Sequence, residues 1–251
     1  MSFKDIFNID AEVKESAHAR VNLIGEHTDY TGGYVMPTLL SFKNTIEISQ
    51  NNSNEFTVYS QHFKEKKTFN DFKKSSDNEW VDYIKGCLHI FFEENKISSK
   101  CLKIYISSDI PLERGISSSS ALCVATLKAL NTFFETKIKD PEIAKLAKKV
   151  EFNYIGVSGG IMDQMVSSIG IHGKAFFMNC KNLEYELINF PENWKFCLID
   201  SEVQRNLRDS SYNERFAELQ EAEKKLGVEY LGEVKKENFQ TNKFDNNTIA
   251  K

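Results

Sequence analysis

Residues 20–37 read RVNLIGEHTDYTGGYVMP, and this stretch holds the strongest information about the fold and function of the chain. The largely apolar run Val21–Ile24 can anchor a strand, and Gly25 and the pair Gly32–Gly33 then let the backbone turn sharply. Between these turns, Glu26–Asp29 projects carboxylates, an imidazole and a hydroxyl group from one loop. Carboxylates accept hydrogen bonds from hydroxyl groups and an imidazole can donate or accept, so the loop suits sugar recognition. A solvated surface turn would explain any one of these side chains but not the whole string.

The sequence around this loop alternates between strand-like and helical patterns, which predicts a mixed α/β (α+β) chain. Strands are expected where β-branched or aromatic residues concentrate, at Thr45–Ser49, Glu55–Ser60, Leu102–Ser107, Ala175–Asn179 and Phe196–Asp200. Helices are expected where apolar residues recur with helical spacing, at Trp80–Glu94, Ser118–Phe134, Pro141–Asn153 and Asn213–Leu226. Asp140 is expected to cap the third helix, with Pro141 at its first position, and Gly227 to end the fourth.

The composition is typical of a globular protein whose partners are small molecules. Of the 251 residues, 41% are hydrophobic and 27% charged, and the formal net charge is -4. This charge provides no basic field, which argues against general binding to nucleic acid or a membrane surface. The N-terminal residues are unlike a signal peptide and no apolar stretch has the length of a membrane span, so we expect a cytoplasmic protein. The oligomeric state stays open, with a monomer as our expectation. The cysteines show no metal-ligand spacing and predict reduced, mostly buried thiols.

A second polar segment, PLERGISSSSA at Pro111–Ala121, lies between a predicted strand and a predicted helix. Backbone N–H groups and the dipole at a helix N-terminus attract phosphates, and serine hydroxyl groups add donors, so the segment predicts an anion site. It is not a GxxxxGK[ST] phosphate loop, because no lysine follows. An ordinary capped helix is the simpler interpretation of the serine run taken alone.

A third segment, EFNYIGVSGGIMDQ at Glu151–Gln164, contains two carboxylates with different possible roles. A sugar hydroxyl group is a poor nucleophile until a positioned group orients it or accepts its proton, which Asp163 could do. Mg²⁺ prefers oxygen ligands and usually keeps waters, so Glu151, a serine hydroxyl group and ATP phosphates would suffice to bind it. Sequence spacing alone does not show that the two carboxylates converge.

Together the three segments resemble the galactokinases, a family within the GHMP kinase superfamily. The string R-V-N-L-I-G-E-H-T-D-Y-x-G-G, which begins at Arg20, is similar to the galactokinase signature nearly residue for residue. Pro111–Ala121 resembles the GHMP pattern P-x-G-x-G-L-S-S-S-A-A, and G-G-I-M-D-Q resembles the motif of the family's catalytic aspartate. The chain departs from the family at two places: His18-Ala19 replaces the usual Pro-Gly, and Glu113 stands where the family has glycine.

Glu113 adds negative charge at a phosphate-loop position, where like charges repel strongly at short range. We expect its side chain to point to solvent, with Arg114 beside it as partial compensation. The alternative is that Glu113 faces the phosphates and weakens ATP binding.

The resemblance implies a role for individual residues. Asp163 is the implied catalytic aspartate, and Arg20 is implied to lie beside the transferring phosphoryl group and to stabilise its charge. The implied sugar contacts are Glu26, His27, Thr28, Asp29 and, in a looser match, Tyr212. The implied nucleotide contacts are Gly115, Ile116, Ser117, Ser118 and Ser119, with Trp80 near the adenine. Ser119 and Glu151 are the implied Mg²⁺ ligands, and Ser118 stays open as an alternative to Ser119. A plain helix-start tyrosine and core packing remain competing interpretations of Tyr212 and Trp80.

The resemblance also implies a two-lobe GHMP kinase fold that transfers a phosphoryl group from ATP to the anomeric hydroxyl group of galactose. Residues 1–172 would form the N-terminal lobe with the sugar and phosphate loops, and residues 173–251 the start of a truncated C-terminal lobe. Truncation is expected because the family's third, glycine-rich motif is not found. Two alternatives remain: a GHMP kinase for another sugar such as arabinose or N-acetylgalactosamine, and a non-catalytic sensor that binds galactose and ATP.

Overall fold

The computed structural model describes residues 1–76, 79–111, 114–200 and 210–235, with the backbone alone at 210–212. These residues form an eight-stranded sheet in the order β2-β7-β3-β6-β4-β5, with β1 paired to β3 and β8 to β7. β4 and β6 run parallel, whereas the other neighbouring strands are antiparallel. The strands are β1 (Val13–Asn22), β2 (Tyr34–Val35), β3 (Pro37–Gln50), β4 (Phe56–Ser60), β5 (Glu65–Phe69), β6 (Leu102–Ser108), β7 (Lys174–Asn179) and β8 (Tyr185–Asn189).

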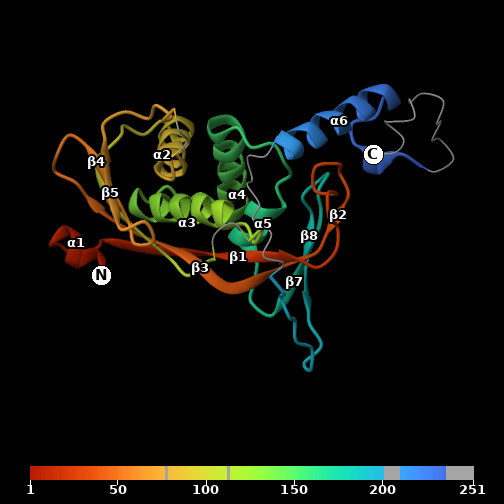
Figure 1. The fold of residues 1–251 in the computed structure, drawn as a ribbon, viewed down its shortest axis with the longest axis horizontal. Helices are drawn as coiled ribbons and strands as arrows, with labels where there is room; N and C mark the ends of the chain where they lie inside the picture. The colour runs from red at the N-terminus through yellow and green to blue at the C-terminus, as the bar shows by residue number, and fades with distance from the viewer. Residues whose placement is uncertain (77–78, 112–113, 201–209, 236–251) are drawn as a thin grey trace.

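Helices cover one face of the central strands (Figure 1). Helix α3 lies across β1 and β3, and α2 and α4 pack beside α3. A π-helical turn, Val150–Ile155, directly continues α4. The helices are α1 (Phe3–Phe7), α2 (Val81–Asn95), α3 (Ser118–Phe133), α4 (Asp140–Lys149), α5 (Met162–Ile169) and α6 (Ser210–Leu226), and a 3-10 turn follows at Leu231–Glu233.

The main apolar core fills the space between the sheet and helices α2, α3 and α4. Its fully buried side chains come from every layer, among them Ile46, Ile104, Leu88, Leu127 and Ile143. A second cluster packs α5 against β7 through Met165 and Phe176. Because α3 is held by the core along its length, its N-terminal end has a fixed position above the end of β1, where the polar segments meet.

The structure confirms the four predicted helices and four of the five predicted strands, with boundaries that differ by up to eight residues. The predicted strand Phe196–Asp200 is wrong: the segment forms no strand with any part of the chain that the structure describes, and Ile199 is 88% exposed. The helix expected to reach Asn153 ends as an α-helix at Lys149 and continues as the π-helical turn. Asp140 is the first residue of α4 rather than its cap, since Lys139 occupies that position without a side-chain hydrogen bond.

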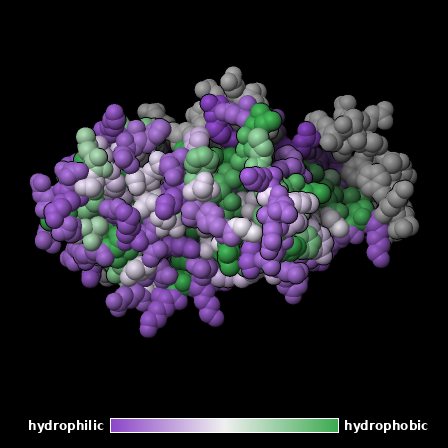
Figure 2. Space-filling view, turned by 90° about the horizontal axis from the view of Figure 1, so that it is seen from below, coloured by the Kyte–Doolittle hydropathy of each residue, from purple (hydrophilic) through white to green (hydrophobic). Residues whose placement is uncertain are grey.

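The face that Figure 2 shows is mostly hydrophilic, with apolar patches more frequent toward the half of the molecule that contains β7, β8 and α6. The exposed apolar side chains in this half include Tyr34, Ile188 and Trp194. Among the described residues, no helix is long and apolar enough to cross a membrane. All five cysteines are free, and Cys87, Cys123 and Cys180 are buried, as expected. Cys101 is partly buried and Cys197 is exposed.

Candidate active site

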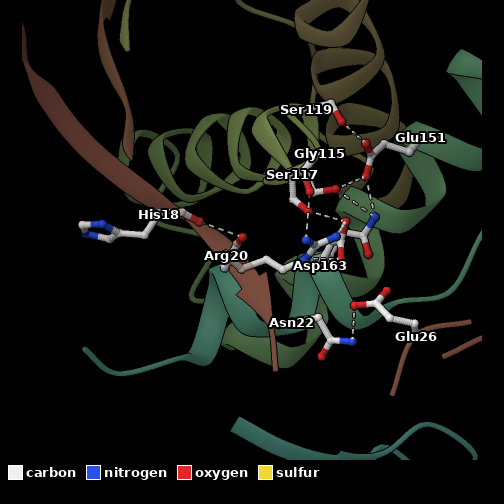
Figure 3. A network of polar contacts seen from close by, with 12 residues as sticks. His18, Arg20, Asn22, Glu26, Gly115, Ser117, Ser119, Glu151 and Asp163 are labelled. Carbon is white, nitrogen blue, oxygen red and sulfur yellow. Dashed lines mark hydrogen bonds and ion pairs between the residues drawn. The ribbon is translucent and has the colours of Figure 1, made fainter. Parts of the chain in front are cut away.

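The end of β1, the N-terminus of α3 and the N-terminus of α5 meet at one place (Figure 3). A register shift in the pairing of β1 with β3 falls between His18 and Arg20, so the strand is irregular where it approaches this place. The backbone N–H of Arg20 donates to the carbonyl of Ile116 at 3.2 Å, which ties β1 to the segment before α3. The structure therefore brings together the first and second polar segments, which are almost a hundred residues apart.

Arg20 and Asp163 form a bidentate ion pair at the centre of the site. Arg20 Nε lies 2.6 Å from Asp163 Oδ1, and Nη2 lies 2.7 Å from Oδ2. Burial alone would lower the pKa of the Arg20 guanidinium, but the Asp163 carboxylate raises this pKa above its ordinary value. Two parallel charge-assisted hydrogen bonds fix the plane of a carboxylate as well as its position. Asp163 is thus held in one orientation by a residue 143 positions earlier in the chain.

Ser117 links this ion pair to α3. Its hydroxyl donates to Asp163 Oδ2 at 2.5 Å, and Arg20 Nη1 donates to the Gly115 carbonyl at 3.2 Å. Ser117 and Gly115 both have a positive φ, of 62° and 70° respectively. Glycine tolerates this region, whereas a serine there is strained and persists only where surrounding contacts hold it. The turn therefore directs the Ser117 hydroxyl at Asp163 as it begins the helix.

Glu151 lies under the first turn of α3 as the acceptor of a buried hydrogen-bond network. Ser119 Oγ donates to Oε1 at 2.8 Å and Ser120 Oγ donates to Oε2 at 2.7 Å. Gln164 Nε2 also donates to Oε2, while its Oε1 has no partner among the described residues. Burial raises the pKa of the Glu151 carboxyl, and the three hydrogen bonds oppose that rise. Sequence reasoning missed Ser120 and Gln164, although both directly follow motif residues that it did identify.

Ser119 and Glu151 fit a Mg²⁺ ion by the chemistry of their atoms. A carboxylate and a hydroxyl group 2.8 Å apart offer the hard oxygen donors that Mg²⁺ prefers. The described residues contain no group of three or more His, Cys, Asp or Glu side chains that could hold a metal. A magnesium ion here would therefore need phosphate and water oxygens to complete its shell. Ser118 shows a different contact, since its carbonyl accepts from Asn44 Nδ2 at 2.9 Å.

Asp29 faces the site from the loop after β1. Its carboxylate packs against Gly160 so closely that a Cβ atom built there would lie 2.0 Å from Oδ2. Burial and the nearby charge of Asp163 raise the pKa of Asp29 to about 6, although Lys148 and Arg20 oppose this shift. Among the described residues, no side chain donates a hydrogen bond to this carboxylate. Its own backbone N–H donates to it, and the acceptor capacity that remains makes Asp29 a candidate acceptor for the hydroxyl groups of a ligand.

The other residues of the Glu26–Asp29 run differ in how far they are free to contact a ligand. Glu26 is exposed and accepts from Asn22 Nδ2 at 3.1 Å. His27 is exposed, and its Nδ1 lies in contact with the Tyr30 hydroxyl. The Thr28 hydroxyl faces inward instead, 2.8 Å from the Gly25 carbonyl and 2.7 Å from that of Tyr34. In this structure Thr28 therefore shapes the loop.

Trp80 and Tyr212, two of the expected ligand contacts, are not among the side chains that the structure describes beside the Arg20–Asp163 pair. Trp80 stacks on Phe63 with ring centroids 5.7 Å apart, and its indole donates to Glu65 at 2.9 Å. Tyr212 falls in α6, but its side chain is outside the described residues. The same helix approaches the site through Asn213, whose Oδ1 accepts from the Ser158 backbone at 3.2 Å.

Glu113, the departure from the phosphate-loop pattern, also lies outside the described residues. Arg114 next to it is described, and its Nε pairs with Asp200 at 3.0 Å. The expected compensation of Glu113 by Arg114 therefore stays a prediction.

Comparisons with known proteins agree with this geometry. Residues 1–50 match the galactokinase galactose-binding signature, and residues 82–170 match the N-terminal domain of the GHMP kinases. A crystal structure of Lactococcus lactis galactokinase complexed with galactose superposes with a TM-score of 0.88 and 31% identity, covering 98% of this chain and 67% of that one. The chain belongs to the galactokinase family.

Curated galactokinases show the same relationship. The enzyme of Thermotoga petrophila is 36% identical over 91% of this chain, and that of Pyrococcus furiosus is 37% identical over 89%. The chain spans 64% and 63% of the length of these two galactokinases. Methanococcus jannaschii mevalonate kinase shares the fold alone, with a TM-score of 0.61 at 22% identity. The expected family and the α/β GHMP kinase fold are thus confirmed, while the boundary between lobes at residue 172 stays a prediction.

Proposed function

We propose that this galactokinase-family protein transfers the γ-phosphoryl group of ATP to the anomeric hydroxyl group of galactose. The observation that carries the proposal is the direct contact of Arg20, Ser117 and Asp163, which come from three separate segments. Phosphoryl transfer requires little covalent chemistry from a protein, so positioned charges and hydrogen bonds supply most of the catalysis. A preorganised guanidinium beside a preorganised carboxylate meets that requirement.

In the proposed reaction Asp163 orients the anomeric hydroxyl group or accepts its proton. Arg20 holds the carboxylate in plane through two hydrogen bonds and keeps a positive charge where the transferring group becomes more negative. Ser117 fixes the second oxygen of Asp163 from the other side. The proton therefore has a positioned acceptor, and the developing charge has a positioned cation next to it.

Sugar binding is assigned to the loop after β1 and nucleotide binding to the start of α3. Asp29 is the principal proposed sugar acceptor, with Glu26 and His27 at the exposed edge, Thr28 as a lining residue and Tyr212 as a further contact. Residues 115–119 would bind phosphates through backbone N–H groups and serine hydroxyl groups at the helix N-terminus. Ser119 and Glu151 would hold Mg²⁺, which neutralises phosphate charge when bound. Trp80 remains the proposed adenine neighbour, and a monomer in the cytoplasm remains our expectation.

The test is ATP-dependent phosphorylation of a panel of galactose, arabinose, N-acetylgalactosamine and glucose. It is run on the 251-residue chain and on any longer form of the protein that contains it. We expect turnover that is fastest with galactose and about 10²–10⁴-fold slower in Asp163→Asn. Faster turnover of another sugar would assign a different substrate, and binding of galactose and ATP without turnover would identify a sensor.

A further inference from the structure

Lys148, in the last turn of α4, differs from the other lysines of that helix. Lys145 and Lys149 form ion pairs with Glu142 and Glu94, each at 2.7 Å. Lys148 is partly buried, and among the described residues it has no carboxylate oxygen within ion-pair distance. Its ammonium group donates instead to the backbone carbonyl of Gly159, across the turn that leads to α5. This lysine is therefore directed into the structure rather than toward solvent.

The turn held by Lys148 lies directly against the proposed sugar acceptor. Gly159 is followed by Gly160, whose backbone is in contact with the carboxylate of Asp29. Three residues after Gly160 comes Asp163, at the N-terminal end of α5. A displacement of this turn would therefore reach both Asp29 and Asp163.

Lys148 also acts on Asp29 through its charge. Among the described residues, the charged groups that act on the pKa of Asp29 are Asp163 from α5, Lys148 from α4 and Arg20 from β1. The titratable Tyr30 hydroxyl and Cys180 thiol also lie near its charge. Arg20 is committed to Asp163 through two hydrogen bonds. Burial lowers the pKa of Lys148, and the charges of Glu151, Asp29 and Asp163 oppose that shift. Among the described residues, Lys148 is therefore a positive charge near Asp29 that is not already paired with another carboxylate.

We propose that Lys148 is a positioning residue of the sugar pocket: it fastens the Gly159–Gly160 turn to α4 and, through that turn and its own charge, holds Asp29 ready to accept sugar hydroxyl groups. The proposal deepens the proposed function, because the ligand of Asp29 is taken to be galactose.

Three substitutions separate the hydrogen bond from the charge. Lys148→Met removes both, Lys148→Gln retains a donor for the Gly159 carbonyl without the charge, and Lys148→Arg retains both. Lys149→Met is the matched control, because it removes a neighbouring lysine whose partner is the exposed Glu94. Circular dichroism and thermal melting identify the variants that fold, and Lys148→Gln and Lys148→Arg keep the test decisive if Lys148→Met does not.

The first measurement needs no ligand and follows the titration of Asp29 by carboxyl ¹³C NMR. The pKa of Asp29, about 6 in the wild type, is expected to rise by about one unit in Lys148→Met and Lys148→Gln. It is expected to stay unchanged in Lys148→Arg and in the control. The second measurement compares KM for galactose and for ATP. In Lys148→Met, KM for galactose is expected to rise roughly tenfold while KM for ATP changes by less than about twofold, and Lys148→Arg should restore most of the loss.

The two measurements also separate this inference from the proposed function. An unchanged Asp29 titration in Lys148→Met and Lys148→Gln would overturn the role of Lys148, whatever the substrate is. Equal increases in both KM values would overturn it as well, since they indicate a general structural defect. If the titration shifts but the wild type neither binds nor phosphorylates galactose, the proposed substrate fails and the positioning of Asp29 stands.

Discussion

Glu151 and Asp29 are two carboxylates in the same site whose surroundings differ in one decisive respect. Burial is the main cause of the raised pKa of both, and the charge of Asp163 adds to it in both cases. Glu151 accepts hydrogen bonds from Ser119, Ser120 and Gln164. Among the described residues, no side chain donates to Asp29.

This difference separates a carboxylate that three side chains of the fold bind from one whose donor is its own backbone N–H. Buried polar groups in proteins are nearly always hydrogen-bonded, because an unsatisfied group costs about 1–3 kcal/mol. The network around Glu151 meets this demand internally and connects the π-helical turn to α3 and α5. Asp29 accepts from its own backbone N–H, and its oxygens are not among the buried atoms that lack a partner in the described residues. Its remaining capacity to accept is therefore open to water or to the hydroxyl groups of a ligand.

The largest expected effect lies at Asp163, whose charge acts on both carboxylates. A positioned base or orienting group contributes about 10²–10⁴-fold to a rate, so Asp163→Asn should reduce turnover of galactose by that factor. Galactose should still bind, as isothermal titration calorimetry would report. Turnover within a few-fold of the wild type would remove Asp163 from the mechanism and leave the comparison without its catalytic centre.

Glu151→Ala tests whether the hydrogen-bond network around Glu151 stabilises the fold. The substitution leaves the donors of Ser119, Ser120 and Gln164 without their acceptor, so the free energy of unfolding should fall by about 2–3 kcal/mol. Urea denaturation followed by circular dichroism gives this value. Glu94→Ala, on the exposed surface of α2, is a suitable control and should change stability by less than about 0.5 kcal/mol. A stability equal to that of the wild type would mean that the Glu151 network is not structural.

Asp29→Asn tests, through sugar binding, the carboxylate to which no described side chain donates. An amide replaces a charged acceptor at the proposed sugar hydroxyl contact, so KM for galactose should rise about 10–100-fold, while KM for ATP changes by less than about threefold. Steady-state kinetics with each substrate varied in turn measures both. Asp10→Asn, an exposed carboxylate paired with Lys4 at 3.0 Å, serves as the control. Equal changes in the two KM values would indicate that Asp29 does not contact the sugar.

The smallest expected effect is the pH dependence of stability that Asp29 produces. Its pKa is about 6 in the folded chain against an ordinary value of 3.8, so the folded state holds its proton more tightly. The contribution of Asp29 to stability is therefore fully present below pH 3.8, falls as the pH rises and is lost above about 6. At pH 7.5, Asp29→Asn should accordingly be more stable than the wild type by roughly 1–2 kcal/mol. Thermal melts of both proteins across this pH range check the difference, and a variant less stable than the wild type at pH 7.5 would contradict it.

Local patterns predicted most of the elements because the information for them lies within a few residues. The helices at 80–94 and 118–134 have apolar residues at helical spacing, and they form within a residue or two of these limits. Phe196–Asp200 has the composition of a strand, but a strand also needs a neighbour to pair with, and no described strand pairs with it. The eight residues of α5 follow Gly159–Gly160, and so short a helix gives too few apolar repeats to predict.

The sequence by itself determined the three polar segments and, through its resemblance to galactokinases, identified Arg20, Glu151 and Asp163 as residues of one site. Residue types and their spacing can be read from the sequence without knowledge of the fold. Only the tertiary structure decided how these residues share their hydrogen bonds, because the partners of Asp163 include Arg20, 143 positions away. It also decided that, among the described residues, side chains donate to Glu151 but not to Asp29, and that Lys148 turns inward. Burial and hydrogen bonding depend on every element packed around a side chain, and no short stretch of sequence contains that information.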